Sequence, residues 1–202
     1  MMDPKIRQAW EDFLDPAVMR PRLISASIFI AAFETLKDAI VGRIRDFFTF
    51  GFDEKGAHVD SKYKDDVLCR NRSPTYASLD WLKEQGAINE SDLARFERVK
   101  SCRNHLAHDL FRVVGSEGLP ADFEVALQDM VGLLGKIERW WISNVEIPTN
   151  PDFDGEEIDH DGIVPGRLMM LQVLCQVALS PEEQSRVYLE EFKRRLGKEE
   201  GA

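Results

Sequence analysis

Cysteine is scarce in this 202-residue sequence and follows no pairing pattern. The three cysteines, Cys69, Cys102 and Cys175, are far apart, and none belongs to a Cys-x-x-Cys pair. Disulfide-stapled secreted domains usually carry an even number of cysteines, and zinc ribbons carry them in close pairs. We therefore expect neither a disulfide framework nor a zinc ribbon, and we expect a reducing compartment.

Long apolar runs are missing as well. The most apolar stretch, residues 23–33, is too short to cross a bilayer and leads into Glu34, Lys37 and Asp38. The first ten residues are polar and lack the apolar core of a signal peptide. The sequence thus predicts a cytoplasmic protein with no membrane segment.

The signatures of several enzyme classes are also absent. The sequence has no P-loop, no GxGxxG, no GxSxG and no HExxH, which argues against P-loop NTPases, dinucleotide enzymes, esterases and zincins. The net charge of -10 argues against general coating of polyanions, because nucleic-acid binders usually carry a basic footprint. A local basic patch is still compatible with that charge.

Helical periodicity, by contrast, is widespread. Apolar residues recur at spacings of three and four in several segments, which is the pattern of helices with one buried face. Asp3-Pro4 and Asp15-Pro16 each pair an acidic N-cap with a proline at the first helical position. The expected helices cover residues 23–50, 75–85, 89–114, 123–141 and 166–179, with a last one ending near residue 196.

No segment shows the alternation of a β-strand, and residues 51–72 are polar and aperiodic, so we expect a loop there. The sequence predicts an all-α fold, an up-and-down four-helix bundle with additional N- and C-terminal helices. Residues 1–146 would form the bundle, and residues 166–202 a C-terminal helical extension. Residues 147–165, rich in acidic residues and prolines and without Lys or Arg, would be an acidic linker or a surface loop.

The helix expected before residue 114 carries an unusual polar set. On a helical wheel its core face consists of residues spaced three and four apart: Phe96, Val99, Cys102, Leu106, Leu110 and Val113. Arg103 falls inside this apolar arc, where a half-buried guanidinium needs an acidic or phosphate partner. Glu34 is one candidate. Asn104 and His108 are neighbours on the opposite face, so the amide is placed to hydrogen-bond the imidazole and select its tautomer.

Taken singly, these residues have ordinary structural explanations, since an arginine at a core rim usually reaches solvent or a salt bridge. As a whole, the string Arg103-Asn104-His105-Leu106-Ala107-His108 resembles the hallmark of HEPN domains, which are helical bundles. That hallmark is an arginine, a polar residue that is often asparagine, three to five further residues, and a histidine. The resemblance covers roughly residues 23–144.

The resemblance implies a metal-independent endoribonuclease that acts as a homodimer without a cofactor. Two copies of the motif helix would meet across a two-fold axis and form one RNA-binding cleft. By transfer, His108 would move protons around the RNA 2′-hydroxyl and the leaving 5′-oxygen, Arg103 would hold the scissile phosphate, and Asn104 would orient the pair. A toxin–antitoxin or defence role follows from the resemblance alone.

One position departs from part of the family. Some HEPN toxins carry a tyrosine two residues after the histidine, where a partner nucleotidyltransferase modifies it. Here that position is Leu110. An antitoxin or nucleotidyltransferase partner is therefore an open expectation, and such a partner would have to act without that tyrosine.

Basic residues gather around the motif. Between residues 94 and 112, five basic side chains outnumber two acidic ones. Four of the basic residues are candidate RNA-binding residues in addition to Arg103: Arg95, Arg98, Lys100 and Arg112. Such a patch can contact phosphates, and the alternative is an ordinary solvated helix face.

Metal-ligating residue types also occur, but not in complete sets. Cys102, His105 and His108 drift by about 60° per step around a helix, and no fourth ligand is evident. Residues 157–162 begin like an EF-hand loop, but Leu168 occupies the position of its bidentate glutamate. We expect no metal site.

The alternative to a ribonuclease is a non-catalytic helical binding module of the same fold, acting as an adaptor or a nucleotide-binding partner. The motif favours the enzyme, because a pure scaffold has no physical need for Arg103, Asn104 and His108 together. The acidic net charge favours the binding module. Whether two motif helices face each other across a dimer would distinguish them.

Overall fold

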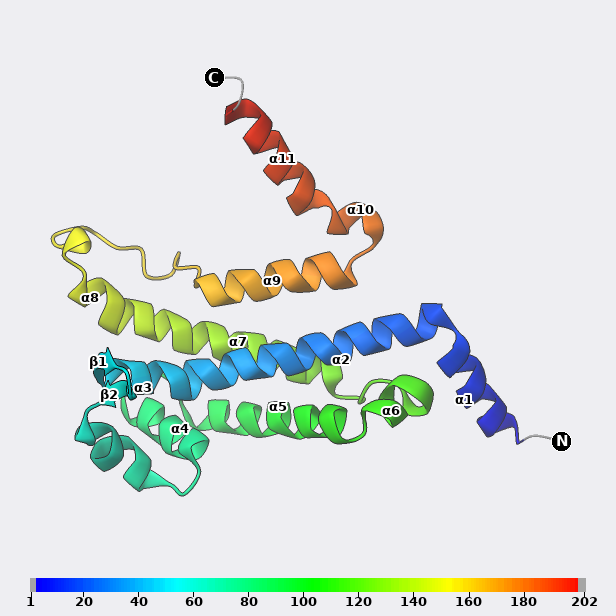
Figure 1. Cartoon of the computed structure of the whole chain (residues 1–202), viewed down its shortest axis with the longest axis horizontal. Coiled ribbons are helices and arrows are strands. Elements are labelled where there is room, and N and C mark those ends of the chain that lie inside the picture. The colour runs from blue at the N-terminus through cyan, green and yellow to red at the C-terminus, as the bar shows by residue number, and fades with distance from the viewer. Residues whose placement is uncertain (1–2, 200–202) are drawn as a thin grey trace.

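The structure, a computed structural model, describes residues 3–199, with their side chains except at positions 182 and 197–199. The described chain is mostly helical and has one small two-stranded sheet. Its centre consists of three long helices that run alongside one another (Figure 1): α2 (Pro16–Lys37), α5 (Glu90–His108) and α7 (Phe123–Trp141). The predicted predominance of helix is confirmed.

The first core helix differs from its prediction at both ends. α2 begins at Pro16, because the Asp15 side chain accepts a hydrogen bond from the Ala17 amide (2.8 Å) and proline suits the first helical position. Beyond α2 the helix continues as a π-helical turn η1 (Asp38–Gly42) and a short α3 (Arg43–Phe47). The helical run therefore starts earlier and stops sooner than its periodicity predicts.

The predicted loop over residues 51–72 is wrong. The chain there forms an antiparallel hairpin and two short helical turns: β1 (Thr49–Asp53), β2 (Gly56–Val59), η2 (Tyr63–Val67) and η3 (Leu68–Arg70). The hairpin alternates partly buried and exposed residues, but its two phenylalanines, Phe50 and Phe52, lie on the exposed side, so its apolar pattern does not mark a buried face. Tyr63 and Val67 are buried one turn apart, but the charged residues between them hide this pattern.

Three helices match their predictions to within one residue at each end. They are α4 (Pro74–Glu84), α7 and α9 (Gly166–Leu179). The core lies among α2, η1, α4, α5 and α7, and its largest fully buried side chains include Phe29, Leu36, Ile40, Leu79, Leu82, Phe96, Leu106, Met130, Leu134 and Ile137. Full burial of one such side chain contributes about 1.5–3 kcal/mol, so this core accounts for the packing of the central helices.

The motif helix is shorter than predicted. α5 ends at His108 rather than near Val114, because Asp109 leaves the helical conformation (φ -114°, ψ 24°). Aspartate favours helix ends, since its side chain competes for local backbone hydrogen bonds. The short α6 (Leu110–Arg112) and π-helical η4 (Val113–Glu117) follow. Val113 is nevertheless buried and Leu110 packs against the core, as the wheel predicts.

The first helix, α1 (Pro4–Leu14), lies outside the core. It buries none of its residues, packs against η4, and is joined to α2 by an ion pair between Asp12 and Arg22 (2.9 Å). Four large apolar residues of α1 are exposed: Ile6, Trp10, Phe13 and Leu14. The N-terminal helix therefore presents an apolar surface at the end of the molecule where α5 ends (Figure 1).

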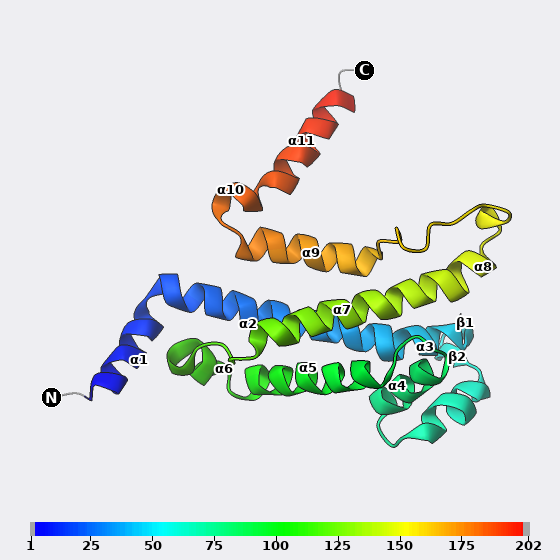
Figure 2. The same cartoon turned by 180° about the vertical axis from the view of Figure 1, so that it is seen from behind.

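After α7 the chain turns back along the central helices. Three short helical turns lead into irregular residues 154–165: η5 (Ile142–Glu146), α8 (Ile147–Thr149) and η6 (Pro151–Phe153). The segment predicted as an acidic linker or surface loop thus includes two of these turns. α9 then packs against α2 and α7 (Figure 2), and Arg167 links Asp38 (2.8 Å) to the buried Glu138 (3.6 Å).

The last described elements are α10 (Glu182–Ser185) and α11 (Val187–Glu199). α11 points away from the other helices in both overall views. Among the residues that the structure describes, no helix combines the length and the apolar character needed to cross a membrane.

Candidate functional site

The start of α5 is set by a capping box. The Asn89 side chain accepts a hydrogen bond from the Asp92 amide (3.2 Å), and the Asp92 carboxylate accepts one from the Asn89 amide (2.9 Å). This reciprocal pair satisfies two amides that a helix start would otherwise leave free. It therefore fixes where α5 begins and how its later residues are rotated.

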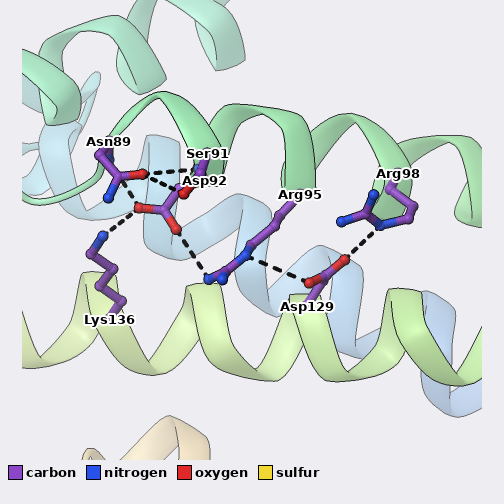
Figure 3. Close-up of polar contacts among 7 residues, drawn as sticks. All are labelled: Asn89, Ser91, Asp92, Arg95, Arg98, Asp129 and Lys136. Atoms are coloured by element: carbon purple, nitrogen blue, oxygen red, sulfur yellow. Dashed lines mark hydrogen bonds and ion pairs between the residues drawn. The ribbon is translucent and has the colours of Figure 1, made fainter.

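An ionic network then holds one flank of α5 against α7 (Figure 3). Asp92, only 1% exposed, pairs with Lys136 of α7 and with Arg95 (3.3 Å). Asp129 of α7 pairs with Arg98 (2.7 Å) and with Arg95 (3.7 Å). Burial raises the pKa of the Asp92 carboxyl, but the hydrogen bonds from Lys136 and the Asn89 backbone outweigh it, and the pKa lies below its usual value.

The four candidate RNA-binding residues do not come together. Arg95 and Arg98 lie on the flank that faces α7 and are paired with carboxylates there. Arg112 lies beyond α5 and pairs with Glu117. Lys100 lies on the other flank, near Arg103. The local excess of positive charge is thus divided among three places, because the helix turns successive residues to different sides.

Arg103 has the partner expected from the helical wheel. Its side chain is 30% exposed, and its Nη2 donates to Glu34 Oε1 of α2 (3.1 Å), which confirms the expected pair. The guanidinium also lies over the Phe33 ring, 5.3 Å from its centroid, a cation–π contact. The Nε of Arg103 is buried and has no hydrogen-bond partner among the described residues.

Asn104 and His108 are not joined as expected. The Asn104 Oδ1 accepts a hydrogen bond from Arg103 Nη1 (3.4 Å). His108 is exposed on the last turn of α5, and the described residues offer it no hydrogen-bond partner. His108 comes five positions after Arg103, a rotation of about 140° around the helix. Arg103 and Asn104 are thus joined by a hydrogen bond, whereas His108, about 40° from Asn104 around the helix, points away from Arg103.

Arg103 and Asn104 line a pocket of about 180 Å³ between α2, α4 and α5, called the α4–α5 pocket below. Its wall consists of Phe33, Glu34, Lys37, Ser73, Thr75, Tyr76, Phe96, Lys100, Arg103 and Asn104. Lys100 Nζ donates to the Tyr76 hydroxyl (2.6 Å), which donates in turn to Glu97 (2.5 Å). The hydrogen bond with Tyr76 raises the pKa of Lys100. The pocket is therefore a cationic recess.

The sequence does not predict that the start of α4 forms one side of this pocket. Ser73, Thr75 and Tyr76 are close to the motif only because α4 packs beside α5. Pro74 marks the start of α4 in the sequence, but nothing local indicates which helix lies next to it. Only the packing of α4 shows that its N-terminus faces Lys100.

A second cavity is apolar and is lined in part by the segment that follows α5. It has a volume of about 390 Å³ and lies between α1 and the segment after α5, with Trp10, Phe13 and Phe111 among its lining residues. Phe111 is 88% exposed, only three residues beyond His108. An exposed phenylalanine next to exposed apolar residues of α1 is typical of a surface that contacts another protein chain.

The described residues offer no cluster of metal ligands, and the cysteine of the motif helix is a core residue. Among them, no three His, Cys, Asp or Glu side chains are grouped closely enough to hold a metal ion. Burial, and secondarily the charge of Asp122, raises the pKa of the Cys102 thiol to about 12. Cys102 therefore remains a protonated core residue at neutral pH.

Comparison with known proteins identifies no relative: no family model, no curated protein and no solved structure matches the chain.

Proposed function

We propose that this protein is a metal-independent endoribonuclease of the HEPN kind, built on a four-helix bundle and acting as a homodimer in the cytoplasm. The observation that carries the proposal is the arrangement of the motif on α5. Arg103 and Asn104 are held together in a cationic pocket, and His108 is exposed on the last turn of the same helix. A guanidinium, an amide and an imidazole in reach of one RNA strand are the groups that phosphodiester cleavage requires.

The proposed reaction uses the RNA's own 2′-hydroxyl. Its oxygen attacks the adjacent phosphorus, the bond to the 5′-oxygen breaks, and the products are a 2′,3′-cyclic phosphate and a 5′-hydroxyl. The 2′-proton must leave and the 5′-oxygen must gain one, and histidine is the side chain best suited to both transfers near neutral pH. Arg103 would stabilise the negative charge that develops on the phosphate oxygens.

The homodimer follows from the rotation between the motif residues. Arg103 and His108 are about 140° apart around α5, so one chain does not direct both groups at the same atom. If two α5 helices face each other, each exposed His108 lies near the second chain's motif. The exposed apolar surface of α1 and Phe111, next to His108, would be covered by such an arrangement.

The chemistry is tested by incubating the full chain with single-stranded and structured RNAs in EDTA. We expect cleavage that is unaffected by the chelator and leaves 2′,3′-cyclic phosphate ends, with no cutting of DNA of the same sequence, because DNA lacks the nucleophile. Cleavage of that DNA, or activity that disappears with EDTA and returns with a divalent cation, would contradict the mechanism.

The dimer is tested with Phe111→Asp, which places a charge in the exposed apolar surface. We expect the dissociation constant of the dimer to rise at least about tenfold, since burying a charge without a partner is costly, and RNA cleavage to fall in parallel. Phe50→Asp is the matched control, because Phe50 is also highly exposed (75%) but lies on the hairpin. Analytical ultracentrifugation measures the dissociation constant of the dimer for wild type and for both variants. A wild-type chain that is monomeric at high micromolar concentration would refute the dimer.

The second candidate function is a non-catalytic helical binding module. The observation that favours it is the ion pair between Arg103 and Glu34, which gives the guanidinium a partner within the chain. In that case Arg103 would join α5 to α2, and the exposed apolar surface of α1 and Phe111 would bind a partner protein. A protein that forms the dimer but cuts none of the RNAs would favour this function.

A further inference from the structure

The α4–α5 pocket combines positive charge with unused hydrogen-bond donors. Three cationic side chains line it, Lys37, Lys100 and Arg103, against one carboxylate, Glu34. This local excess of positive charge stands out in a chain of net charge -10. Phosphate groups are bound in proteins by such sets, an arginine fork with a lysine and further N–H and O–H donors.

The beginning of α4 adds donors to the same pocket. Ser73, the N-cap residue, makes no side-chain cap hydrogen bond, and Pro74 at the first helical position has no N–H. The first amides of α4 after Pro74, those of Thr75 and Tyr76, find no acceptor among the described residues, and both residues line the pocket. Free amides at a helix start, together with the helix dipole, attract anions.

Two side chains in the pocket also have hydrogen-bond donors without an acceptor in the residues that the structure describes. Arg103 Nε is buried without a partner in the described part of the chain. Lys100 Nζ makes its hydrogen bond to Tyr76, which occupies one of the three N–H donors of an ammonium group. A buried guanidinium N–H without an acceptor is unfavourable, so an incoming acceptor oxygen would relieve a cost that the free protein carries.

The size of the pocket limits the ligand. About 180 Å³ is below the roughly 300–1,000 Å³ typical of sites that enclose a whole small molecule. It is ample for one phosphate group, given that a water molecule occupies about 30 Å³ in the liquid. A phosphate that belongs to a strand lying across the surface therefore fits better than a nucleotide enclosed entirely.

We propose that the α4–α5 pocket binds a backbone phosphate of RNA next to the cleaved one, held by Lys100 and the N-terminal amides of α4. Arg103, whose guanidinium carries five N–H donors, contacts both this phosphate and the cleaved one. The assignment to RNA rests on the proposed ribonuclease function, whereas the binding of a phosphate group does not. Lys100 thereby has a role as a substrate-binding residue distinct from that of Arg95 and Arg98, which face α7 (Figure 3). Glu34 is the internal competitor, because it occupies Arg103 until the phosphate arrives.

The test uses the full chain and a fluorescent pentanucleotide RNA whose riboses are 2′-O-methylated, so that 2′-hydroxyl attack is blocked and binding is measured alone. Lys100→Gln should weaken binding about tenfold or more, as expected for hydrogen bonds to a charged group. Lys100→Arg should restore most of the affinity. Glu34→Gln should tighten binding several-fold, because it removes the carboxylate that competes for Arg103. Lys55→Gln, at the exposed hairpin tip, is the charge-matched control and should bind like wild type.

Inorganic phosphate and adenosine 5′-monophosphate serve as competitors. Weak competition by both, with tighter binding of the pentanucleotide, supports the proposal. Wild-type affinity in Lys100→Gln overturns it, provided that its thermal unfolding matches wild type. Tight binding of the mononucleotide without binding of the pentanucleotide overturns the RNA assignment and indicates a small phosphorylated ligand.

The two proposals fail separately. Lys100-dependent binding of the pentanucleotide by a chain that cuts no RNA would leave the phosphate pocket standing and remove the ribonuclease. If the chain cuts RNA efficiently, but Lys100→Gln and Glu34→Gln alter neither RNA binding nor the Michaelis constant, the ribonuclease stands and the phosphate pocket is removed.

Discussion

Replacing His108 by alanine should lower the rate of RNA cleavage by about 10²–10⁴-fold, the range expected when a general acid or base is removed. Of the three proposed catalytic side chains, Arg103, Asn104 and His108, only the imidazole is of a type suited to proton transfer, since arginine stays protonated and an amide does not ionise. Because His108 is exposed and makes no hydrogen bond to the described residues, the variant should fold normally. The measurement is the cleavage rate on one RNA under single-turnover conditions.

His105→Ala is a matched control for this loss. His105 is also exposed and lies on the same helix, three residues earlier and off the line of Asn104 and His108. We expect His105→Ala to cut RNA at the wild-type rate, with superimposable unfolding curves for all three proteins. Equal rates for His108→Ala and His105→Ala would remove His108 from the mechanism and favour the binding module.

The second large effect concerns stability. Asp92→Ala should lower the free energy of unfolding by about 3 kcal/mol, from the loss of a helix cap (about 1 kcal/mol) and of charge-assisted hydrogen bonds to Lys136 and Arg95. The estimate stays at the low end for buried ion pairs because both cationic partners are more than a third exposed. Asp129→Ala, which affects only the more exposed pairs with Arg95 and Arg98, should cost about 1 kcal/mol or less.

The Asp92 contribution should also depend on pH. The pKa of Asp92 in the folded chain lies below its usual value, despite burial, because of its bonds to Lys136 and the Asn89 backbone. A lowered folded pKa means that the stabilisation is complete above the unfolded value of about 3.9 and is lost as the pH falls through the folded value. Denaturant unfolding of wild type and Asp92→Asn should therefore differ most at neutral pH and converge in acid. A constant difference down to pH 2 would contradict this account.

The basic residues of α5 point to two different sides of the helix, so counting charges along the sequence did not predict where they lie. Arg95, Arg98, Lys100 and Arg103 are within nine residues, and the excess of positive charge is real. Asp129 and Asp92 engage the first two residues on the side of α7, and Tyr76 engages Lys100 on the side of α4. The partners come from other helices, so their positions depend on how the helices pack and not on the spacing along α5.

Local signals determined much of the helical framework. Asp-Pro pairs marked helix starts, Pro74 and Gly86 bounded α4, three-four periodicity located α7, and an apolar run located α9, because capping and amphipathicity act over one or two turns of chain. The wheel of α5 placed Arg103 at the core rim and named Glu34 as a partner, since a half-buried charge requires one. The weak pattern of residues 49–70 and the break at Asp109 escaped the same reasoning.

The sequence by itself therefore determined most of the long helices, the faces that they bury, and that Arg103, Asn104 and His108 share one helix. Only the tertiary structure decided that Arg103 and Asn104 line a pocket with the start of α4, that Arg95 and Arg98 face α7, and that Phe111 lines an apolar cavity with α1. The physical reason is one of range. Helix formation depends on neighbours within about four residues, whereas a binding pocket depends on contacts between segments distant in the chain, which no local pattern encodes.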